Sequence, residues 1–208
     1  MKENGQERPG MDANHSISFF DNQFQKQVSE QSFALNPFEE AALPYLTGCV
    51  LDLGCGLGNL VVEAARRGAS VVAVDASPTA IARIQQVAAE EKLALRGVQA
   101  DLKNYQIDGQ FDSIVAIGLL MFFDRPRALE LLDDIQRHVK PGGCVVINVL
   151  IEGTTFLGMF QPGHYYLFGR DELEQCFAGW HILALNYQAF SAPENTEKVF
   201  ATIVARKL

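Results

Sequence analysis

The sequence predicts an α/β fold, an open and doubly wound sheet that is mostly parallel and ends in an antiparallel strand pair. From residue 49 onward, short apolar runs rich in valine alternate with segments of helical period. Such alternation implies right-handed crossovers and a parallel sheet with helices on both faces. Near the C-terminus, two longer strand-like runs are separated by only a short polar stretch. Strands joined this closely pair antiparallel.

The parallel part of the sheet follows from the residue pattern in chain order. Five apolar runs predict strands at residues 50–53, 70–74, 95–100, 111–117 and 145–150. Helical periods predict helices at residues 60–67, 77–92 and 125–138. Ser77 is expected to cap the second helix and Pro78 to start it. The sequence KPGG at residues 140–143 is expected to break the chain before the fifth strand. The buried face of the third helix is expected to consist of Leu129, Leu132, Ile135 and Val139.

Residues 152–169 interrupt this alternation. They contain five aromatic residues, four glycines and a proline without a clean period, which is typical of a binding loop or a lid. A short helix at residues 170–177 is predicted to follow. The remainder predicts two strands, at about 180–190 and 198–205, joined by the polar residues 191–197.

The N-terminal region predicts two segments ahead of the sheet. Residues 1–16 are polar and are expected to form a mobile arm. Residues 17–45 are rich in phenylalanine and predict a lid over the ligand site, with simple packing on the sheet as the alternative. Residues 17–208 are expected to be one domain, because a chain of this length forms a single core. The phenylalanines of the lid are Phe19, Phe20, Phe24, Phe33 and Phe38.

Composition limits the partners of the protein. The 208 residues include 17 Lys and Arg against 25 Asp and Glu, which gives a formal charge of −8. Nucleic acid and anionic membranes bind positive surfaces, so we expect neither as a partner, and we expect a small-molecule substrate instead. There is no apolar run of 18 residues and no signal-peptide core, so a cytoplasmic location is expected. The four cysteines form no CxxC pair and no cluster with zinc spacing, so no metal site is predicted. The sequence as a whole predicts no particular oligomeric state.

A glycine-rich turn at residues 52–59, DLGCGLGN, follows the first predicted strand. Glycines there let the backbone turn sharply and approach a ligand, while the next helix offers free N–H groups. In an open α/β sheet this is also the expected ligand crevice. A dinucleotide-binding GxGxxG turn would need its third glycine at position 59, where this chain has Asn59. The spacing is GxGxG instead.

Carboxylates lie at the ends of the first three predicted strands. Asp52 stands two residues before the first glycine, where it would repel a pyrophosphate and attract a positive group. Asp75, 21 residues after Gly54, is placed to bind ribose hydroxyls, and Asp101 can reach the edge of an adenine. One such acid alone would more simply cap a strand end. Three acids beside the glycine turn favour a cationic nucleoside over a nucleotide with phosphates.

In order and spacing, these motifs resemble those of class I S-adenosylmethionine-dependent methyltransferases. The matching segments, within about residues 48–150, are VLDLGCGLGN, the acid of VVAVDAS, the ADL after the third strand, FDSIVAIG and VKPGG. FAGW and FATIVARK near the C-terminus extend the resemblance to the last strand pair. The resemblance implies a Rossmann-like fold, S-adenosylmethionine as cofactor, and an enzyme that transfers methyl groups.

The resemblance also implies how the cofactor is held. The glycine turn would pack against its methionine part, Asp75 would bind the ribose, and Asp101 with Leu102 would bind the adenine. Gly118 and Leu119 would face the end where the methyl group is transferred. The full implied set is Asp52, Gly54, Cys55, Gly56, Gly58, Asp75, Ala76, Asp101, Leu102, Gly118 and Leu119.

Within that superfamily, the chain looks most like the small tellurite-resistance methyltransferases, through LLMFFDRPRALELLDDIQRHVKPGG and the two C-terminal motifs. A small acceptor is expected, for which a soft nucleophile such as a thiol or a chalcogen oxyanion is one candidate. Such a nucleophile requires no general base, whereas an oxygen or nitrogen acceptor more often needs one. The candidate substrate-side residues are His164, Tyr165, Tyr166 and Arg170.

Two alternatives stay open on the residues alone. An NAD-dependent oxidoreductase would share the sheet, although it favours glycine where Asn59 stands and has no use for Asp52. A protein that binds S-adenosylmethionine without catalysis would need no catalytic residue, and none is assigned here.

Overall fold

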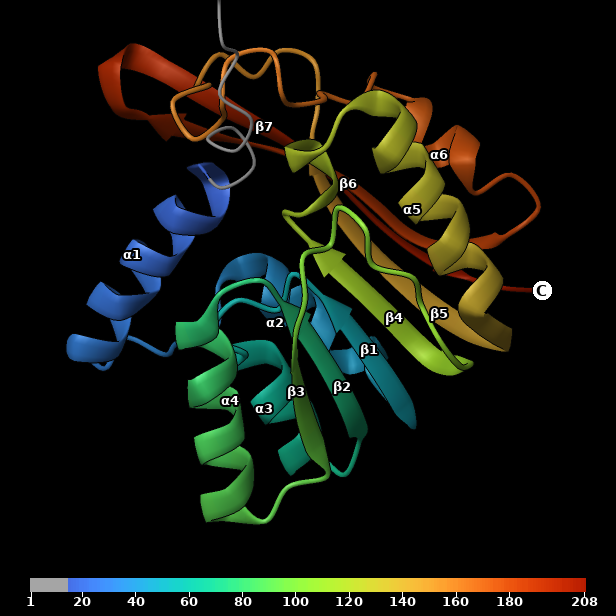
Figure 1. Ribbon diagram of the computed structural model, residues 1–208. Coiled ribbons are helices and arrows are strands. Elements are labelled where there is room, and N and C mark those ends of the chain that lie inside the picture. Colours follow the sequence, from blue (N-terminus) through green and yellow to red (C-terminus); the bar gives the residue numbers. More distant parts are fainter. Residues whose placement is uncertain (1–14) are drawn as a thin grey trace, which may run out of the picture.

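One seven-stranded sheet organises the chain, with its strands in the order β3-β2-β1-β4-β5-β7-β6 (Figure 1). The computed structural model describes residues 15–208. Strands β1 to β5 run parallel, and β7 pairs antiparallel with both β5 and β6. The predicted fold class is therefore confirmed. The strands are β1 Cys49–Leu53, β2 Ser70–Asp75, β3 Leu95–Gln99, β4 Phe111–Ile117, β5 Val139–Leu150, β6 His181–Ala192 and β7 Thr196–Arg206.

The strand order reverses at β1. This strand pairs with β2 on one side and with β4 on the other. In open parallel sheets the connections leave to opposite faces at such a point, so a crevice opens beside the carboxyl ends of the strands. The glycine turn follows β1 at this position.

Helices cover both faces of the sheet (Figure 1). α5 (Arg125–His138) and α6 (Glu172–Cys176) contribute to one core cluster, while α2 (Pro37–Ala42), α3 (Asn59–Arg66) and α4 (Pro78–Glu91) contribute to the other. Strand residues alternate between the clusters, which explains why the central strands are apolar along almost their whole length.

Capping side chains start the two long helices that follow β2 and β4. Ser77 Oγ accepts a hydrogen bond from the Ala80 N–H at 3.0 Å, and Pro78 occupies the first position of α4. In α5, Asp124 Oδ1 accepts from the Arg127 N–H at 3.0 Å. Each cap satisfies a donor that the helix itself leaves free.

The break predicted at residues 140–143 is wrong, because these residues continue β5. The Gly142 N–H donates to the Lys207 carbonyl and the Lys207 N–H donates to the Gly143 carbonyl, both at 2.9 Å. Gly143 is needed for this path, since a Cβ there would lie 2.7 Å from the Asp112 carbonyl oxygen. Proline and glycine thus shape an irregular strand start instead of ending the strand.

The buried face of α5 also differs from the prediction. Leu129 is only partly buried, and Val139 belongs to β5. The helix buries Ala128 against the sheet in place of the predicted Leu129. The residues that it buries are Ala128, Leu131, Leu132 and Ile135.

The N-terminal segment forms α1 (His15–Ser29) and α2. Of the predicted mobile arm, residues 1–14 lie outside the described residues, and residues 15 and 16 already belong to α1. α1 contacts α4 near the carboxyl ends of the strands (Figure 1). Short 3-10 turns complete the chain at η1 Leu43–Tyr45, η2 Leu120–Phe122 and η3 Pro193–Asn195.

Candidate functional site

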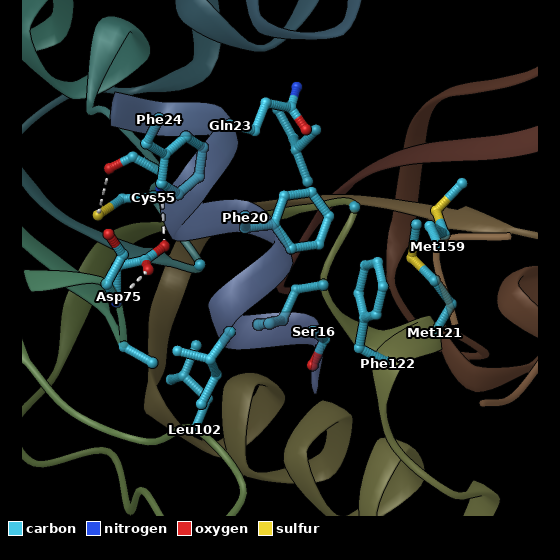
Figure 2. A pocket seen from close by; sticks show the side chains of 18 of the residues that line it. Ser16, Phe20, Gln23, Phe24, Cys55, Asp75, Leu102, Met121, Phe122 and Met159 are labelled. Atoms are coloured by element: carbon cyan, nitrogen blue, oxygen red, sulfur yellow. Dashed lines mark hydrogen bonds between the residues drawn. The ribbon is translucent and has the colours of Figure 1, made fainter. Parts of the chain in front are cut away.

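A cavity of about 690 Å³ opens at the carboxyl ends of the parallel strands (Figure 2). Its walls come from the glycine turn after β1, the ends of β2, β4 and β5, helix α1, the loop at residues 152–169, and β7. The cavity therefore lies at the reversal of strand order, where a ligand site is expected in this fold. Asp52 and Asp75 lie beside the glycine turn, at the end that is predicted to hold the cofactor and is called the cofactor end below. Phe20, Met121 and Phe122 lie beyond β4 and β5, at the end that is predicted to face the methyl acceptor and is called the acceptor end below.

The glycine turn combines two requirements. Gly56 lines the cavity with φ +52°, and a Cβ there would come within 3.2 Å of the Phe24 ring of α1. Gly58 has φ +75° but is not on the cavity wall, and a Cβ there would lie 2.5 Å from Ile84 Cγ1. Gly58 is therefore explained by the packing of the turn against α4, whereas Gly54 and Gly56 border the cavity.

Asp75 anchors the turn to the end of β2. Its carboxylate accepts hydrogen bonds from the Gly56 N–H at 2.9 Å and from the Ser77 N–H at 2.8 Å. Burial raises the pKa of Asp75 above its ordinary value, although these backbone hydrogen bonds partly oppose the rise. Asp75 also lines the cavity. Its predicted contact with a ribose remains a prediction.

Asp52 is a buried carboxylate on the cavity wall and is only 4% exposed. Burial, together with the nearby charges of Glu39 and Asp75, raises the pKa of Asp52 well above its usual range. A buried charge in such a place is stable only when something positive pairs with it. The wall at Asp52 is therefore suited to a cationic ligand group.

Glu39 is a further acid at this end, and the sequence analysis did not identify it. It belongs to a capping box at the start of α2, in which Asn36 Oδ1 accepts from the Glu39 N–H at 3.0 Å and the Asn36 N–H donates to Glu39 Oε2 at 2.8 Å. Burial raises the pKa of Glu39. The run NPFE signals a helix start, but only the fold brings this acid into the cavity near Asp52.

The other residues assigned to the cofactor lie along the same wall. Asp101 is exposed after β3, where its Oδ1 accepts from the Lys103 N–H at 2.9 Å. Gly118 donates its N–H to the Asn148 carbonyl at 2.9 Å and ends β4 beside the cavity. The cavity brings together, from the assigned set, Asp52, Gly54, Cys55, Gly56, Asp75, Ala76, Asp101, Leu102, Gly118 and Leu119.

The acceptor end is built from rings and thioethers. Figure 2 shows Phe20 of α1 facing Phe122, with Met121 and Met159 beside them. The Phe20 and Phe122 rings meet edge to face with centroids 5.2 Å apart. On the β7 side, Phe200 also lines this end. A ligand here meets mainly carbon and sulfur atoms.

Of the four substrate-side candidates, the structure brings only His164 to the cavity wall. Tyr165 stacks on Phe160 with centroids 4.8 Å apart and does not line the cavity. Arg170 lies outside it with its guanidinium 4.6 Å from the Tyr187 ring centroid.

Tyr166 also lies outside the cavity. Its hydroxyl donates to Glu172 and accepts from Arg125 Nε at 3.1 Å. Burial and the hydrogen bond to Glu172 raise the pKa of Tyr166 to about 12. Tyr166 thus joins the loop at residues 152–169 to α5 and α6 and is not placed to act on a ligand.

Helix α1 covers the cavity and is attached beside Asp75. Its Asp21 accepts hydrogen bonds from Ser77 Oγ and, at 3.3 Å, from the Thr79 N–H at the start of α4. Burial pushes the pKa of Asp21 upward, but these hydrogen bonds and one from Gln25 lower it overall. Phe20 and Phe24 of the same helix line the cavity. The predicted role of this segment as a lid remains a prediction.

The described residues, 15–208, contain neither a candidate metal site nor a membrane-spanning helix. No three His, Cys, Asp or Glu side chains in this range are grouped so that they could hold a metal ion. No helix in it combines the length and the apolar character that crossing a membrane requires.

Comparisons with known proteins agree with this geometry. Residues 50–143 match the family model described as a methyltransferase domain. Hemagglutinin 1 of Eikenella corrodens is 34% identical over 136 residues, which cover 64% of this chain and 44% of that protein. The probable S-adenosyl-L-methionine-dependent methyltransferase TehB of Haemophilus influenzae is 27% identical over 165 residues, 76% of this chain and 57% of that protein. The chain thus spans about half the length of these relatives.

Solved structures share the fold. The crystal structure of TehB from Haemophilus influenzae matches with a TM-score of 0.72 and 24% identity, over 91% of this chain and 67% of that chain. The chain therefore shares the fold of the TehB structure, and its residues 50–143 match the methyltransferase-domain model. The chain also matches the N-methyltransferase NodS from Bradyrhizobium japonicum WM9, solved with S-adenosylhomocysteine, with a TM-score of 0.63 and 18% identity, over 89% of this chain and 98% of that chain. These comparisons support S-adenosylmethionine as the cofactor.

The cavity of the chain fits that cofactor. S-adenosylmethionine carries a sulfonium and an ammonium group, and the buried Asp52 offers the negative charge that such groups need. The bare backbone of Gly56 lies where a side chain would press on α1. Asp52, Asp75 and the glycine turn are therefore the residues that would hold it.

Proposed function

We propose that the protein transfers a methyl group from S-adenosylmethionine to a small acceptor whose nucleophile is soft, such as a thiolate or a chalcogen oxyanion. The observation that carries the proposal is the division of one cavity into an acidic end at the glycine turn and an aromatic and thioether end beyond it. The resemblance to small tellurite-resistance methyltransferases supports the same acceptor class.

The charge of the cofactor end favours S-adenosylmethionine over a nicotinamide dinucleotide. Asp52, Glu39 and Asp75 lie close together at this end, and in their ionised form they attract a sulfonium and an ammonium and repel a pyrophosphate. Asn59 stands at the position where a dinucleotide turn would have its third glycine. Both observations disfavour the oxidoreductase alternative.

The soft nucleophile is supported by the composition of the acceptor end. Met121, Phe122 and Met159 offer no group that could remove a proton. The neighbouring His164 lines the cavity from an exposed loop position. An acceptor that arrives already ionised needs no base, and a thiol ionises far more readily than an alcohol.

Bound S-adenosylmethionine supplies an electrophilic methyl group. The acceptor thiolate forms a new sulfur–carbon bond with its own electron pair, while the electron pair of the broken carbon–sulfur bond stays on the sulfur of the departing S-adenosylhomocysteine. One negative and one positive charge disappear, and no proton is transferred. The protein contributes alignment of the two groups and exclusion of water.

A competition assay tests the proposal. The full chain is incubated with S-adenosylmethionine and, one at a time, an aryl thiol, selenite, a phenol and an aniline, and methylated products are measured by mass spectrometry. We expect turnover of the thiol or selenite at least tenfold above the phenol and the aniline. Preferential methylation of the phenol or the aniline would contradict the soft-nucleophile assignment, and no methylation of any acceptor would contradict the activity.

A further inference from the structure

We propose that the acceptor of this methyltransferase carries an anionic group remote from its nucleophile, and that Lys198 binds this group at the outer part of the acceptor end. The inference rests on the proposed function, because it concerns the acceptor in the same cavity. It makes Lys198 a residue that determines acceptor specificity.

Strand β7 leads from the transfer end of the cavity to Lys198. Alternate residues of a strand share one face, so Lys198, Phe200 and Thr202 point to the same side of β7. Thr202 Oγ1 accepts from Asn148 Nδ2 at 2.8 Å, and the Asn148 carbonyl accepts from the Gly118 N–H at 2.9 Å. Gly118 is the residue assigned to the methyl-transfer end. From there this face of β7 passes Phe200 and reaches Lys198, both of which line the cavity.

Within residues 15–208, the ammonium of Lys198 packs over an aromatic ring. Its Nζ lies 4.6 Å from the Phe156 ring centroid, and the side chain is partly buried. No carboxylate within residues 15–208 forms an ion pair with it. A partly desolvated ammonium over an aromatic face is only partly compensated and attracts a further anion.

The other cations of the cavity are placed differently. Arg127 donates to the carbonyls of Leu102 and Tyr105 at 2.8 and 2.9 Å, so its guanidinium is already engaged. Lys103 is exposed after β3, at the end assigned to the adenine. Lys198 is thus the lysine that faces the acceptor end.

The space between Gly118 and Lys198 fits a flat apolar body. The Phe38 and Phe200 rings, with centroids 4.8 Å apart, line this stretch. Thr202 and Lys198 are four positions apart on β7, which corresponds to about 13 Å along the strand. An acceptor of two linked aromatic rings would therefore have its nucleophile near Gly118 and its anionic group near Lys198, at opposite ends of the molecule.

Two matched pairs of compounds test this inference. 4′-Mercaptobiphenyl-4-carboxylate and its carboxamide have the same shape and differ in charge, as do 4′-hydroxybiphenyl-4-carboxylate and its carboxamide. The two pairs differ from each other in the nucleophile. Each compound is titrated calorimetrically, under a phosphine reductant, into the full chain saturated with S-adenosylhomocysteine.

We expect both carboxylates to bind at least tenfold more tightly than their amides. Lys198→Met should remove this preference while the affinity for S-adenosylhomocysteine stays within twofold of wild type, which also shows that the variant is folded. Lys198→Arg should retain the preference. Arg170→Met is the matched control, since Arg170 also lies over a ring but outside the cavity, and it should bind all four compounds like wild type.

Equal binding of acid and amide, no binding of any compound, or an unchanged preference in Lys198→Met would overturn the inference. Failure of the soft-nucleophile proposal has a different signature. In that case the carboxylate preference persists in both pairs, but with S-adenosylmethionine the phenols are methylated and the thiols are not.

Discussion

The two ends of the cavity are built in different ways. The cofactor end is held by hydrogen bonds that backbone N–H groups donate over a short stretch of chain, from Gly56 to the Asp75 carboxylate and from Gly54 to the Val74 carbonyl. The acceptor end is held by side-chain packing between segments that are far apart in sequence, as in the contact of Phe20 with Phe122. The cofactor end thus depends on the path of the backbone around a few acids, whereas the acceptor end depends on the packing of side chains.

This difference separates cofactor binding from acceptor choice. Backbone contacts depend little on side-chain identity, so the cofactor end constrains only a few glycines and acids. A wall of packed rings changes shape with every substitution. We therefore expect substitutions at the cofactor end to change affinity for S-adenosylhomocysteine, and substitutions at the acceptor end to change acceptor affinity alone.

The largest expected effect is a loss of unfolding free energy in Gly58→Ala, which tests whether Gly58 serves the packing of the glycine turn. Gly58→Ala places a Cβ 2.5 Å from Ile84 Cγ1 at φ +75°, so we expect unfolding free energy to fall by about 3 kcal/mol from overpacking and backbone strain. Gly68→Ala is the control, because Gly68 has φ +96° and no atom within 4 Å of a Cβ. That variant should lose only about 1 kcal/mol. Urea unfolding measures both, and equal losses would refute the packing role.

The next effect concerns the anchor of the turn. Asp75→Ala removes the acceptor of the Gly56 and Ser77 N–H groups, so affinity for S-adenosylhomocysteine should fall by about 100-fold, or roughly 2.7 kcal/mol. Asp101→Ala, at an exposed position on the same wall, should weaken binding by less than about tenfold. Calorimetric titration decides, and similar losses in the two variants would show that Asp75 has no special role.

A substitution at the acceptor end gives the opposite pattern. Phe122→Ala removes ring contacts with Phe20 and Phe160, at 5.2 and 5.0 Å between centroids. Acceptor KM should rise about tenfold, since such a ring contributes roughly 1 kcal/mol or more to an apolar wall. Affinity for S-adenosylhomocysteine should stay within twofold of wild type. A parallel loss of both would mean that the two ends are not independent.

The smallest effect is a gain in stability. Burial raises the pKa of Asp52 above its unfolded value, so the ligand-free protein loses stability as pH rises from the unfolded pKa through the folded pKa, and regains it as pH falls. Asp52→Asn removes this penalty. The variant should be more stable near pH 7, by on the order of 1 kcal/mol, yet bind S-adenosylmethionine more weakly.

Thermal unfolding between pH 5 and 8 measures the effect of Asp52→Asn. The difference in Tm between the variant and wild type should grow toward higher pH. A lower Tm for Asp52→Asn throughout this range would show that Asp52 is stabilised by partners within the fold, and not kept for a ligand.

The cofactor end could be predicted because its residues are contiguous or end neighbouring strands. DLGCGLGN is one run, and Asp75 and Asp101 follow apolar strands that are recognisable by themselves. In a parallel sheet such strand ends meet at one edge. The position of the crevice was predicted from the same alternation of elements.

The acceptor end and Glu39 could not be predicted in this way. The phenylalanines of residues 17–45 predicted a lid over the ligand site, but no local pattern indicates that Phe20 meets Phe122 or that Phe200, 180 positions away, borders the same cavity. The sequence around Glu39 is fully explained by a capping box, so nothing in it indicates that the same side chain also lies near Asp52 in the cavity. The strand at KPGG was missed for a related reason, since hydrogen bonds between Gly142 and Gly143 and the backbone of the distant Lys207 keep the run in a strand.

The central claim is that the cofactor end binds S-adenosylmethionine and not a dinucleotide. Its most direct test compares the binding of S-adenosylhomocysteine and NADH to the full wild-type chain by calorimetry. The structure predicts saturable one-to-one binding of S-adenosylhomocysteine and at least 100-fold weaker binding of NADH, because Asp52 and Glu39 repel a pyrophosphate. No binding of S-adenosylhomocysteine, or tighter binding of NADH, would contradict the assignment of the cofactor end.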